Sequence, residues 1–365
     1  MSEWQTFCLK DLGKIVGGAT PPTNNPKNYG NKIAWITPKD LSTLQGHYIK
    51  KGSRSISRLG FKSCSCALLP KHAILFSSRA PIGYVAIAEK RLCTNQGFKS
   101  IIPNKKIYFE FLYYLLKYHK DNISNIGGGT TFKEVSGATL GLFQVKIPPT
   151  YYEQQKIART LSILDQKIEN NHKINELLRT LAYKIYEYYF KYKPKNAKLE
   201  QIIIENPKSN IMVKNAQKTQ DKYPFFTSGD NILSYPKAII DGRNCFLNTG
   251  GNAGIKFYVG KASYSTDTWC ICANEFSDYL YLLLSSIKNH INQSFFQGTS
   301  LKHLQKNLLK KYPIYMPSAH EIKKFNQIIM PLLTLISINT RTSKKLEQIR
   351  DFLLPLLLKQ QVKPQ

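Results

Sequence analysis

The chain has 365 residues, of which 42% are hydrophobic and 12% aromatic. This length and content can fill the cores of two or three domains, which excludes an intrinsically disordered chain. Lys and Arg number 52 against 23 Asp and Glu, so the formal net charge is +29. Such an excess of positive charge predicts a polyanionic partner, with nucleic acid favoured over a membrane surface.

The compartment and the redox state follow from what the sequence lacks. No apolar run reaches the roughly 20 residues of a membrane-spanning helix, and the first residues, MSEWQTFCLKDLG, contain no apolar stretch of a signal peptide. These features predict a cytoplasmic protein. The seven cysteines include Cys64 with Cys66 and Cys270 with Cys272, but no Cys-x-x-Cys pair. We therefore expect reduced, packed cysteines and neither a disulfide framework nor a metal site.

Residues 1–150 are predicted to form a first mixed α/β domain. The segments GYVAIA (83–88) and FQVKIP (143–148) have the composition of short strands, and FEFLYYLLKYHKDNI (109–123) has helical spacing. The Pro- and Gly-rich segment 17–30 marks a surface loop.

The glycine-rich stretch GGGTTFKEV, residues 127–135, resembles a phosphate-binding loop at first sight. Thr131 and Glu134 have the spacing of a capping box, however, which predicts the start of a short helix with Thr131 as its N-cap. A weaker copy, QGTSLKHL, follows at residues 297–304, with Ser300 in the cap position. The exposed amides of such a helix start could hold a DNA phosphate.

A long helix is predicted within residues 151–195. From Glu153 to Phe190 there is no Gly or Pro, and side chains suited to a buried seam recur at alternating steps of four and three. These seam positions are Ile157, Leu161, Leu164, Ile168, Asn171, Asn175, Leu178, Ala182, Ile185 and Tyr189. Such a heptad pattern predicts a coiled coil.

Residues 196–318 are predicted to form a second domain that repeats the first. Residues 129–135 and 298–304 match at an offset of 169, which also relates Val145 to Ile314 and Pro148 to Pro317. Upstream, Gly83 is aligned with Gly254, Thr94 with Thr266, residues 35–41 with 225–231, and the helical segment 109–123 with 278–292. Chance similarity of surface turns would not keep this order.

Residues 319–365 are predicted to form a second long helix. A shift of 168 maps the first seam onto Phe325, Ile329, Leu332, Ile336, Asn339, Ser343, Leu346, Arg350, Leu353 and Leu357. The equivalent Asn171 and Asn339 are expected to fix the register, because an unpaired amide in an apolar seam is costly. Pro331 and Pro355 interrupt the pattern of this helix, so a kink near Pro331 and fraying after Pro355 are expected. Arg350 also breaks the seam, which leaves ordinary globular packing as the alternative.

These elements together predict an α+β fold. It consists of two mixed α/β domains joined by two long helices that form an antiparallel coiled coil, with a pseudo-two-fold internal repeat. Thirty-eight residues at ~1.5 Å rise span roughly 57 Å, whereas successive half-sites on one face of DNA lie roughly 34 to 36 Å apart. A coiled coil of this length can therefore act as a ruler.

Candidate DNA contacts lie in five segments. In the first domain they are the basic loop 50–62 and the small-residue turn around Arg79, since Arg reads guanine bidentately and cations and hydroxyls contact phosphates. In the second they are residues 243–256, where Asn can read adenine; the two glycine-rich stretches add hydroxyls. The candidates are Lys50, Lys51, Arg54, Arg58, Lys62, Ser78, Arg79, Thr130, Thr131, Arg243, Asn248, Asn252, Lys256, Thr299 and Ser300. A salt bridge is the alternative for Arg79, and a tight turn for the glycines near Asn252.

Motifs of catalysis are missing from the sequence. The segment IPPTYY, residues 147–152, resembles the D-P-P-Y loop of amino-methyltransferases, but Ile147 replaces the required polar residue. A G-x-x-x-x-G-K-[ST] motif is absent, and the acidic residues show no paired nuclease arrangement. We therefore predict no catalytic residues in this chain.

Across nearly its whole length the chain resembles the specificity (S) subunits of type I restriction-modification systems. The resemblance rests on ITPKDL (36–41), SSRAPIGYVAIA (77–88), TNQGF (94–98), GGGTTFKEVS (127–136) and KIPPTYYEQQKIARTLSILDQKI (146–168). It implies two target-recognition domains that each read half of a split DNA sequence, and two helices that set the gap and bind two methyltransferase subunits. The second domain departs from the pattern, because NTGGNAGIKF replaces SSRAPIGY and His303 stands where the first domain has the capping Glu134.

The resemblance also implies a division of chemistry among subunits. A nuclease-translocase subunit joins the complex, and S-adenosylmethionine, ATP and Mg are expected in the partner subunits rather than in this chain. Alternatives are a specificity subunit of a fused restriction-methylation enzyme, a self-sufficient DNA-modifying enzyme, and a coiled-coil scaffold that binds nucleic acid without sequence preference.

Overall fold

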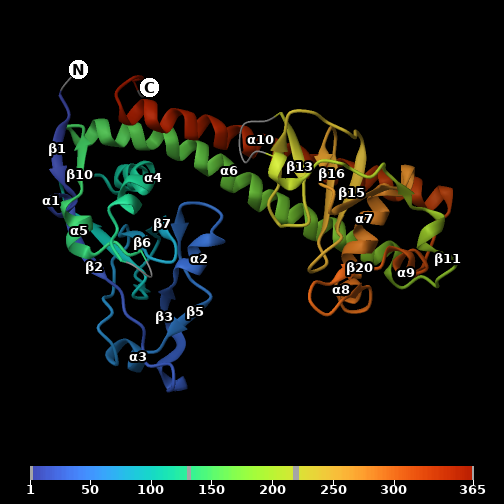
Figure 1. Ribbon diagram of the computed structural model, residues 1–365, viewed down its shortest axis with the longest axis horizontal. Coiled ribbons are helices and arrows are strands. Elements are labelled where there is room, and N and C mark those ends of the chain that lie inside the picture. Colours follow the sequence, from blue (N-terminus) through green and yellow to red (C-terminus); the bar gives the residue numbers. More distant parts are fainter. Residues whose placement is uncertain (1–2, 130–132, 217–221, 364–365) are drawn as a thin grey trace. The chain divides into compact units, whose positions relative to one another are not determined.

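The computed structural model describes residues 3–129, 133–216 and 222–363. The chain divides into two units, each of which is described by itself (Figure 1). Unit 1 contains Met1–Glu169 and Ile349–Gln365, and unit 2 contains Asn170–Gln348. Each unit therefore combines a mixed α/β domain with one part of each long helix.

Unit 1 is built on a five-stranded sheet and two smaller sheets. The large sheet has the order β2 (Gly13–Gly17), β9 (Lys99–Pro103), β6 (Ile74–Ser78), β7 (Ile82–Ala88) and β4 (Tyr48–Ile49). A three-stranded sheet has the order β5 (Arg54–Ile56), β3 (Tyr29–Ile36) and β8 (Cys93–Thr94). The third sheet pairs β1 (Gln5–Cys8) with β10 (Gln144–Ile147).

The helices of unit 1 connect its strands, and α4 packs on the large sheet. They are α1 (Leu9–Leu12), the 3₁₀ turn η1 (Pro26–Asn28), α2 (Pro38–Ser42), α3 (Arg58–Lys62), α4 (Phe109–Asn125) and α5 (Gly137–Leu142). Phe111 and Leu115 of α4 share one buried core with Phe76 of β6 and Ile87 of β7. All residues from Phe111 to Leu116 are buried, so this part of α4 is covered on more than one side, and the sheet covers one of them.

Unit 2 repeats this topology in shortened form. Its four-stranded sheet has the order β12 (Ile204–Glu205), β18 (Thr268–Cys272), β15 (Arg243–Asn248) and β16 (Ile255–Val259). The three-stranded sheet has the order β14 (Leu233–Tyr235), β13 (Tyr223–Phe226) and β17 (Ser263–Tyr264). Two further pairs are β11 (Ala197–Lys198) with β21 (Pro313–Ile314), and β19 (Phe296–Gln297) with β20 (His303–Leu304). The first two sheets follow the order of their counterparts in unit 1.

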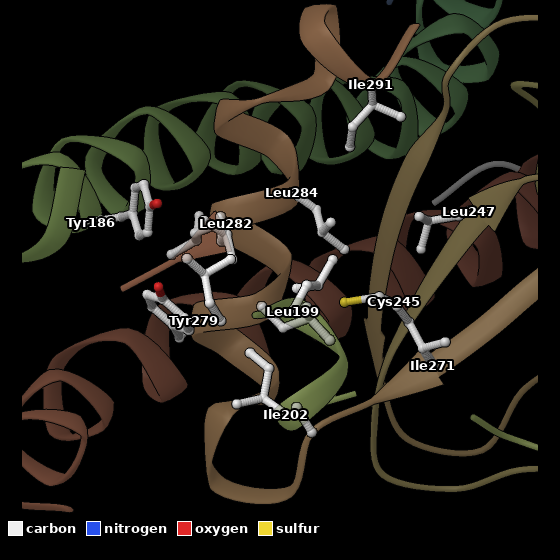
Figure 2. Packing of buried hydrophobic residues seen from close by; sticks show 14 of the residues in the cluster. Tyr186, Leu199, Ile202, Cys245, Leu247, Ile271, Tyr279, Leu282, Leu284 and Ile291 are labelled. Atoms are coloured by element: carbon white, nitrogen blue, oxygen red, sulfur yellow. The ribbon is translucent and has the colours of Figure 1, made fainter. Parts of the chain in front are cut away.

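The predicted helix over 278–292 is interrupted in the structure. Helix α7 (Ser277–Ser286) ends before Ile287, and α8 (Lys288–Ser294) follows it. The remaining short helices of unit 2 are α9 (Lys306–Lys310) and the 3₁₀ turns η3 (Leu199–Gln201), η4 (Val213–Asn215) and η5 (Asn274–Phe276). Figure 2 shows side chains of α7, such as Tyr279 and Leu282, packed with Tyr186 of the first long helix and Cys245 of β15.

Matching hydrogen bonds in the two units establish the internal repeat. The amide of Val135 donates to the carbonyl of Ser78 at 3.0 Å, and the amide of Leu304 donates to the carbonyl of Thr249 at 2.9 Å. The offsets are those expected from the sequence, 169 and 171.

One detail of the predicted alignment is wrong. Thr94 corresponds to Tyr264 rather than Thr266, because Thr94 pairs with Ile36 as Tyr264 pairs with Phe226. Both pairs are parallel bridges at the same place in the small sheet.

The two long helices are α6 (Tyr151–Tyr186), which continues into the π-helical turn η2 (Glu187–Lys191), and α10 (Ala319–Leu358). In unit 2 they run antiparallel, since Asn171 contacts Ser343 while Asn175 contacts Ile336. In unit 1, Asp165 contacts Arg350. The prolines do not interrupt the second helix, because α10 continues through Pro331 and Pro355 and ends at Leu358, three residues after Pro355. The kink expected near Pro331 stays a prediction.

The predicted seam positions lie on the inner side of these helices. Among them Ile157, Leu161, Ile168, Asn175 and Ala182 of α6 are buried, as are Phe325, Ile329, Ile336, Ser343 and Leu357 of α10. The others, Leu164, Asn171, Leu178, Ile185, Tyr189, Leu332, Asn339, Leu346, Arg350 and Leu353, are half-buried. Within the described ranges, no helix is both long enough and apolar enough to cross a membrane.

The predicted helix start at the glycine-rich stretch is also wrong. Helix α5 begins at Gly137, and the Ser136 hydroxyl caps it by accepting from the amide of Thr139 at 3.0 Å. Upstream, Glu134 forms an antiparallel bridge with Gly128, so this part of the stretch is a hairpin. The copy in unit 2 is likewise a hairpin, β19 with β20, before α9. Thr130 and Thr131 lie outside the described residues.

Candidate nucleic-acid interface

In each unit a buried polar side chain closes the turn after the central strand of the large sheet. In unit 1 the Ser77 hydroxyl donates to the carbonyl of Pro81 and accepts from the amide of Tyr84, both at 2.8 Å. In unit 2 the amide of Asn248 donates to the carbonyl of Asn252 at 3.1 Å. The two turns are therefore held in the same way by different residues.

Each of these turns meets the hairpin that follows the main helix or helices of its unit. In unit 1 the contact is ionic: Arg79 lies 3.5 Å from Glu134, which also pairs with Lys99 at 3.3 Å. This ionic contact adds to the backbone hydrogen bond from Val135 to Ser78. In unit 2 the turn and the hairpin are joined through the backbone, by the bond from Leu304 to Thr249 and a bridge between Gly250 and His303. The replacement of Glu134 by His303 thus accompanies the loss of an arginine from the facing turn.

The predicted basic loop 50–62 is not a loop. It contains strand β5 and helix α3, which sit in and beside the small sheet of unit 1. Its cations are nevertheless exposed, and we call four of them, Lys51, Arg54, Arg58 and Lys62, the basic edge. Lys50 is also exposed but lies 3.7 Å from Glu89.

A half-buried carboxylate holds the start of the basic edge in place. Asp40 of α2 accepts hydrogen bonds from the amides of Thr37 and Ser53, both at 2.7 Å. Burial opposes the charge of Asp40, but the hydrogen bonds from Ser53 and Thr37 outweigh it and lower the pKa of this carboxyl. Since Ser53 directly precedes β5, Asp40 fixes where the strand with Arg54 begins.

The remaining candidates of unit 1 lie at the turn after β6. Arg79 is half-exposed and carries the ion pair with Glu134, the alternative foreseen for it. Ser78 is fully buried, and its hydroxyl donates to the carbonyl of Gly97 at 3.3 Å. A direct phosphate contact by Ser78 is therefore the wrong interpretation, because its hydroxyl has no surface to offer.

Three candidates of unit 2 serve the domain's own packing. Arg243 forms a bidentate pair with Asp278 of α7, whose side chain is 2% exposed, and donates to the hydroxyl of Thr334 at 3.0 Å. Lys256 donates to the Thr227 carbonyl at 2.8 Å and to the buried Asn248 side chain at 3.1 Å.

The interpretation of these three as base or phosphate contacts is therefore corrected. Arg243, Asn248 and Lys256 already use their polar atoms within unit 2, and burial lowers the pKa of Lys256. Asn252, Thr299 and Ser300 are exposed and stay predictions.

Sequence reasoning missed a group of lysines in unit 2. A shallow hollow of about 470 Å³ is lined by Tyr223, Pro236, Lys237, Ala238, Ile239, Ile240, Asp241 and Lys261. Lys222 stands 5.4 Å from the centre of the Tyr223 ring. We call Lys222, Lys237 and Lys261, all exposed, the lysine hollow. They come from separate segments, so no local pattern could have revealed them; only the three-stranded sheet brings them together.

The basic edge and the lysine hollow occupy related places. Strand β5 is antiparallel to β3, and β14 is antiparallel to β13, while β8 and β17 run parallel on the other side. The small sheet of each unit therefore carries exposed cations. In unit 2 an aromatic ring lies among them, a combination that suits a nucleic-acid backbone.

The structure offers little for catalysis or metal binding. Among the residues it describes, no group of three His, Cys, Asp or Glu side chains is placed to hold a metal ion. All seven cysteines are free thiols. Burial raises the pKa of Cys93 to about 11 and that of Cys245 well above its ordinary value, so neither is a ready thiolate.

Comparison with known proteins points to one family. Residues 1–179 and 195–348 match the family described as "Type I restriction modification DNA specificity domain". The type I restriction enzyme MjaIX specificity subunit of Methanocaldococcus jannaschii is 32% identical over 403 residues, covering 98% of this chain and 93% of that protein.

Two further relatives agree in kind. The type I restriction enzyme HindI specificity subunit of Haemophilus influenzae is 30% identical over 177 residues, covering 46% of this chain and 37% of that protein. The crystal structure of a type I restriction-modification S subunit from M. genitalium superposes with a TM-score of 0.64 at 18% identity. That superposition covers 97% of this chain and 96% of the other. It extends the likeness to the fold of both units.

Proposed function

This chain belongs to the type I restriction modification DNA specificity family, and from that premise we propose that it reads a bipartite DNA site, one half with each unit. A specificity subunit recognises DNA sequence and is not itself an enzyme. The observation that carries the proposal is the duplication: both units repeat one strand order and both carry exposed cations on the small sheet. Two similar DNA-recognition units in one chain suit a target with two half-sites.

The contacts to DNA fall into two kinds under this proposal. The basic edge and the lysine hollow hold phosphates and supply affinity that depends on salt. The turns after β6 and β15, with Arg79 and Asn252 among their exposed side chains, supply the sequence preference. Arg79 leaves Glu134 or shares it when a guanine or a phosphate is present.

The long helices set the gap between the half-sites and dock the methyltransferase subunits. In unit 2 helix α6 exposes Ile174, Leu177 and Leu181, and the turn η2 that continues it exposes Tyr188. These four residues lie along one flank of the seam. Helix α10 likewise exposes Ile328, Leu335 and Ile338. Isolated exposed apolar residues are ordinary, but steps of three, four and seven along both helices suit further helices packing on them.

The cofactors of the reaction belong to the partners in this scheme. S-adenosylmethionine sits in the methyltransferase subunits, and ATP and Mg sit in a nuclease-translocase subunit. The DNA-specificity chain then recognises the DNA sequence, and its partners carry out the catalysis.

The test is a reconstitution with a type I methyltransferase subunit from the genome that encodes this chain. Methylation-sensitive sequencing of random DNA should show one split motif when both proteins are present and no methylation with either alone. Methylation without sequence preference would refute the proposal, and so would activity of this chain by itself.

The docking surface is tested in the same system. Leu177→Glu places a charge in the apolar row of α6 and should abolish co-purification with the methyltransferase while DNA binding persists. The matched control is Lys173→Glu, which changes an exposed residue of the same helix outside that row. Equal co-purification of the two variants would contradict docking at this row.

A further inference from the structure

A buried ion pair joins the two long helices in unit 1. Arg350 of α10 donates from Nη1 to Oδ1 of Asp165 on α6 at 2.6 Å, and the Asp165 side chain is 7% exposed. Tyr114 of α4 donates its hydroxyl to the other carboxylate oxygen, also at 2.6 Å. The arginine that breaks the heptad seam therefore has a specific partner.

The surroundings of this pair keep it ionised. Burial opposes the charge of Asp165, but Lys117 and Arg350, with hydrogen bonds from Tyr114 and Arg350, lower the pKa of this carboxyl. Arg350 also pairs with the exposed Asp351 at 2.8 Å. Both members carry their charges at neutral pH.

The internal repeat does not preserve this pair. The shift of 168 that relates α6 to α10 carries Asp165 to Leu333 and would bring Ala182 to Arg350. Leu333 and Ala182 are 1% and 0% exposed and belong to the core of unit 2. One unit thus has an ionic layer where the other has an apolar layer.

The amides in the middle of the helices behave differently. Asn171 donates to the Ser343 hydroxyl at 3.2 Å, and Asn339 donates to Asn175 at 3.0 Å. The shift of 168 converts the first pair into the second, because Asn171 becomes Asn339 and Asn175 becomes Ser343. These layers fix the register. They do not distinguish α10 from α6 of a second copy, because an antiparallel pair of two α6 helices would also place Asn171 opposite Asn175.

We propose that the Asp165 and Arg350 pair makes α6 select α10 of its own chain over α6 of a second copy. In an antiparallel pair of two α6 helices, Asp165 would face Ala182, and in a pair of two α10 helices Arg350 would face Leu333. Each alternative buries a charge without its partner, which is strongly unfavourable. The ion pair therefore discriminates between partners that the duplicated, similar helices would otherwise confuse.

The test replaces the ionic layer by the apolar layer of unit 2 in the full-length chain. The variant is Asp165→Leu with Arg350→Ala and Tyr114→Phe, the last because its hydroxyl would lose its acceptor. Two differently tagged forms of each protein are mixed in denaturant, refolded together at several concentrations, and analysed by co-purification and light scattering. The controls are the unchanged chain, Tyr114→Phe alone, and the reversed pair Asp165→Arg with Arg350→Asp and Tyr114→Phe.

We expect the apolar variant to form mixed dimers at least tenfold more often than the controls, which should refold as monomers. An equal fraction of mixed dimers in all four proteins would overturn the proposal. If the apolar variant does not fold, Arg350→Ala against Arg350→Lys carries the same test. Arg350→Ala, which removes the charge, should then give mixed dimers, and Arg350→Lys, which keeps it, should not. The same fraction of mixed dimers from both variants would again overturn the proposal.

Discussion

At the scale of single residues, exposure distinguishes an arginine that can contact DNA from one that stabilises the fold. The side-chain chemistry of the two is the same. Arg54 and Arg243 are both arginines in segments that predict DNA contact. Arg54 is exposed on the basic edge, whereas Arg243 pairs with the buried Asp278. A buried carboxylate that loses its cation is costly, while an exposed arginine contributes little to stability.

The two arginines should therefore give opposite phenotypes. Arg243→Ala is expected to lower the free energy of unfolding by about 3 to 5 kcal/mol, measured by urea denaturation. Arg54→Ala should change it by less than about 0.5 kcal/mol and should instead weaken binding to all DNA sequences, reducing the salt slope by about 1. Equal stability losses would contradict the assignment of Arg54 to the surface. A salt slope unchanged by Arg54→Ala would contradict the role of the basic edge.

At the scale of elements, the start of each long helix is fixed by a short polar motif. The Thr150 hydroxyl accepts from the amide of Glu153 at the start of α6, and the Ser318 hydroxyl accepts from the amide of Glu321 at the start of α10. The Glu321 carboxylate in turn accepts from the Ser318 amide at 3.0 Å. The sequence repeat therefore contains the position at which each helix begins, as well as its seam.

The capping carboxylate of α10 should make stability depend on acid. Hydrogen bonds from the Ser318 amide and the Tyr315 hydroxyl lower the pKa of Glu321 to about 2, from an ordinary 4.5. A depressed pKa contributes stability that is present above pH 4.5 and is lost as the pH falls towards 2. Glu321→Gln should remove that part of the pH dependence in thermal melts between pH 5 and 2. Glu176→Gln, an exposed position on α6, is the control and should leave it unchanged.

At the scale of the whole molecule, the duplication gives the chain two similar units and two long helices. Unit 2 repeats the strand order of unit 1 with one strand fewer in its large sheet and with different side chains in equivalent places. Ser77 and Asn248 brace corresponding turns, and Glu134 and His303 occupy corresponding hairpins. A shared scaffold with different side chains suits two half-sites of different sequence.

The length of the helices should determine the spacing of those half-sites. Inserting one heptad after Asn171 in α6 and one before Ser343 in α10 keeps the seam in phase and adds about 10.5 Å of helix. The gap in the methylated motif should then grow by roughly three base pairs at about 3.4 Å each, as read by sequencing methylated DNA. A heptad in only one helix is the control and should disrupt pairing. An unchanged gap with both heptads inserted would contradict the hypothesis that helix length sets the spacing of the half-sites.

The sequence by itself determined the features that repeat or recur. These features are the duplication, the heptad seams of α6 and α10 and the family motifs. Each is a pattern in the order of residues, so it can be recognised from the sequence alone. The same reading gave the fold class and the specificity function. It predicted a helix start at Thr131, however, because a capping box is a local signal, whereas Glu134 forms a backbone bridge with Gly128 and the helix begins at Gly137.

Only the tertiary structure decided what individual polar side chains are free to do. Asn248 and Lys256 are residue types that often contact DNA, but here they form hydrogen bonds within their own domain. Arg350 interrupts the apolar seam in the sequence, and only the structure shows that it pairs with Asp165. The lysine hollow joins residues that the sequence separates. The physical reason is the same each time: the cost of burying a polar group depends on a partner elsewhere in the chain, and periodicity does not contain that partner.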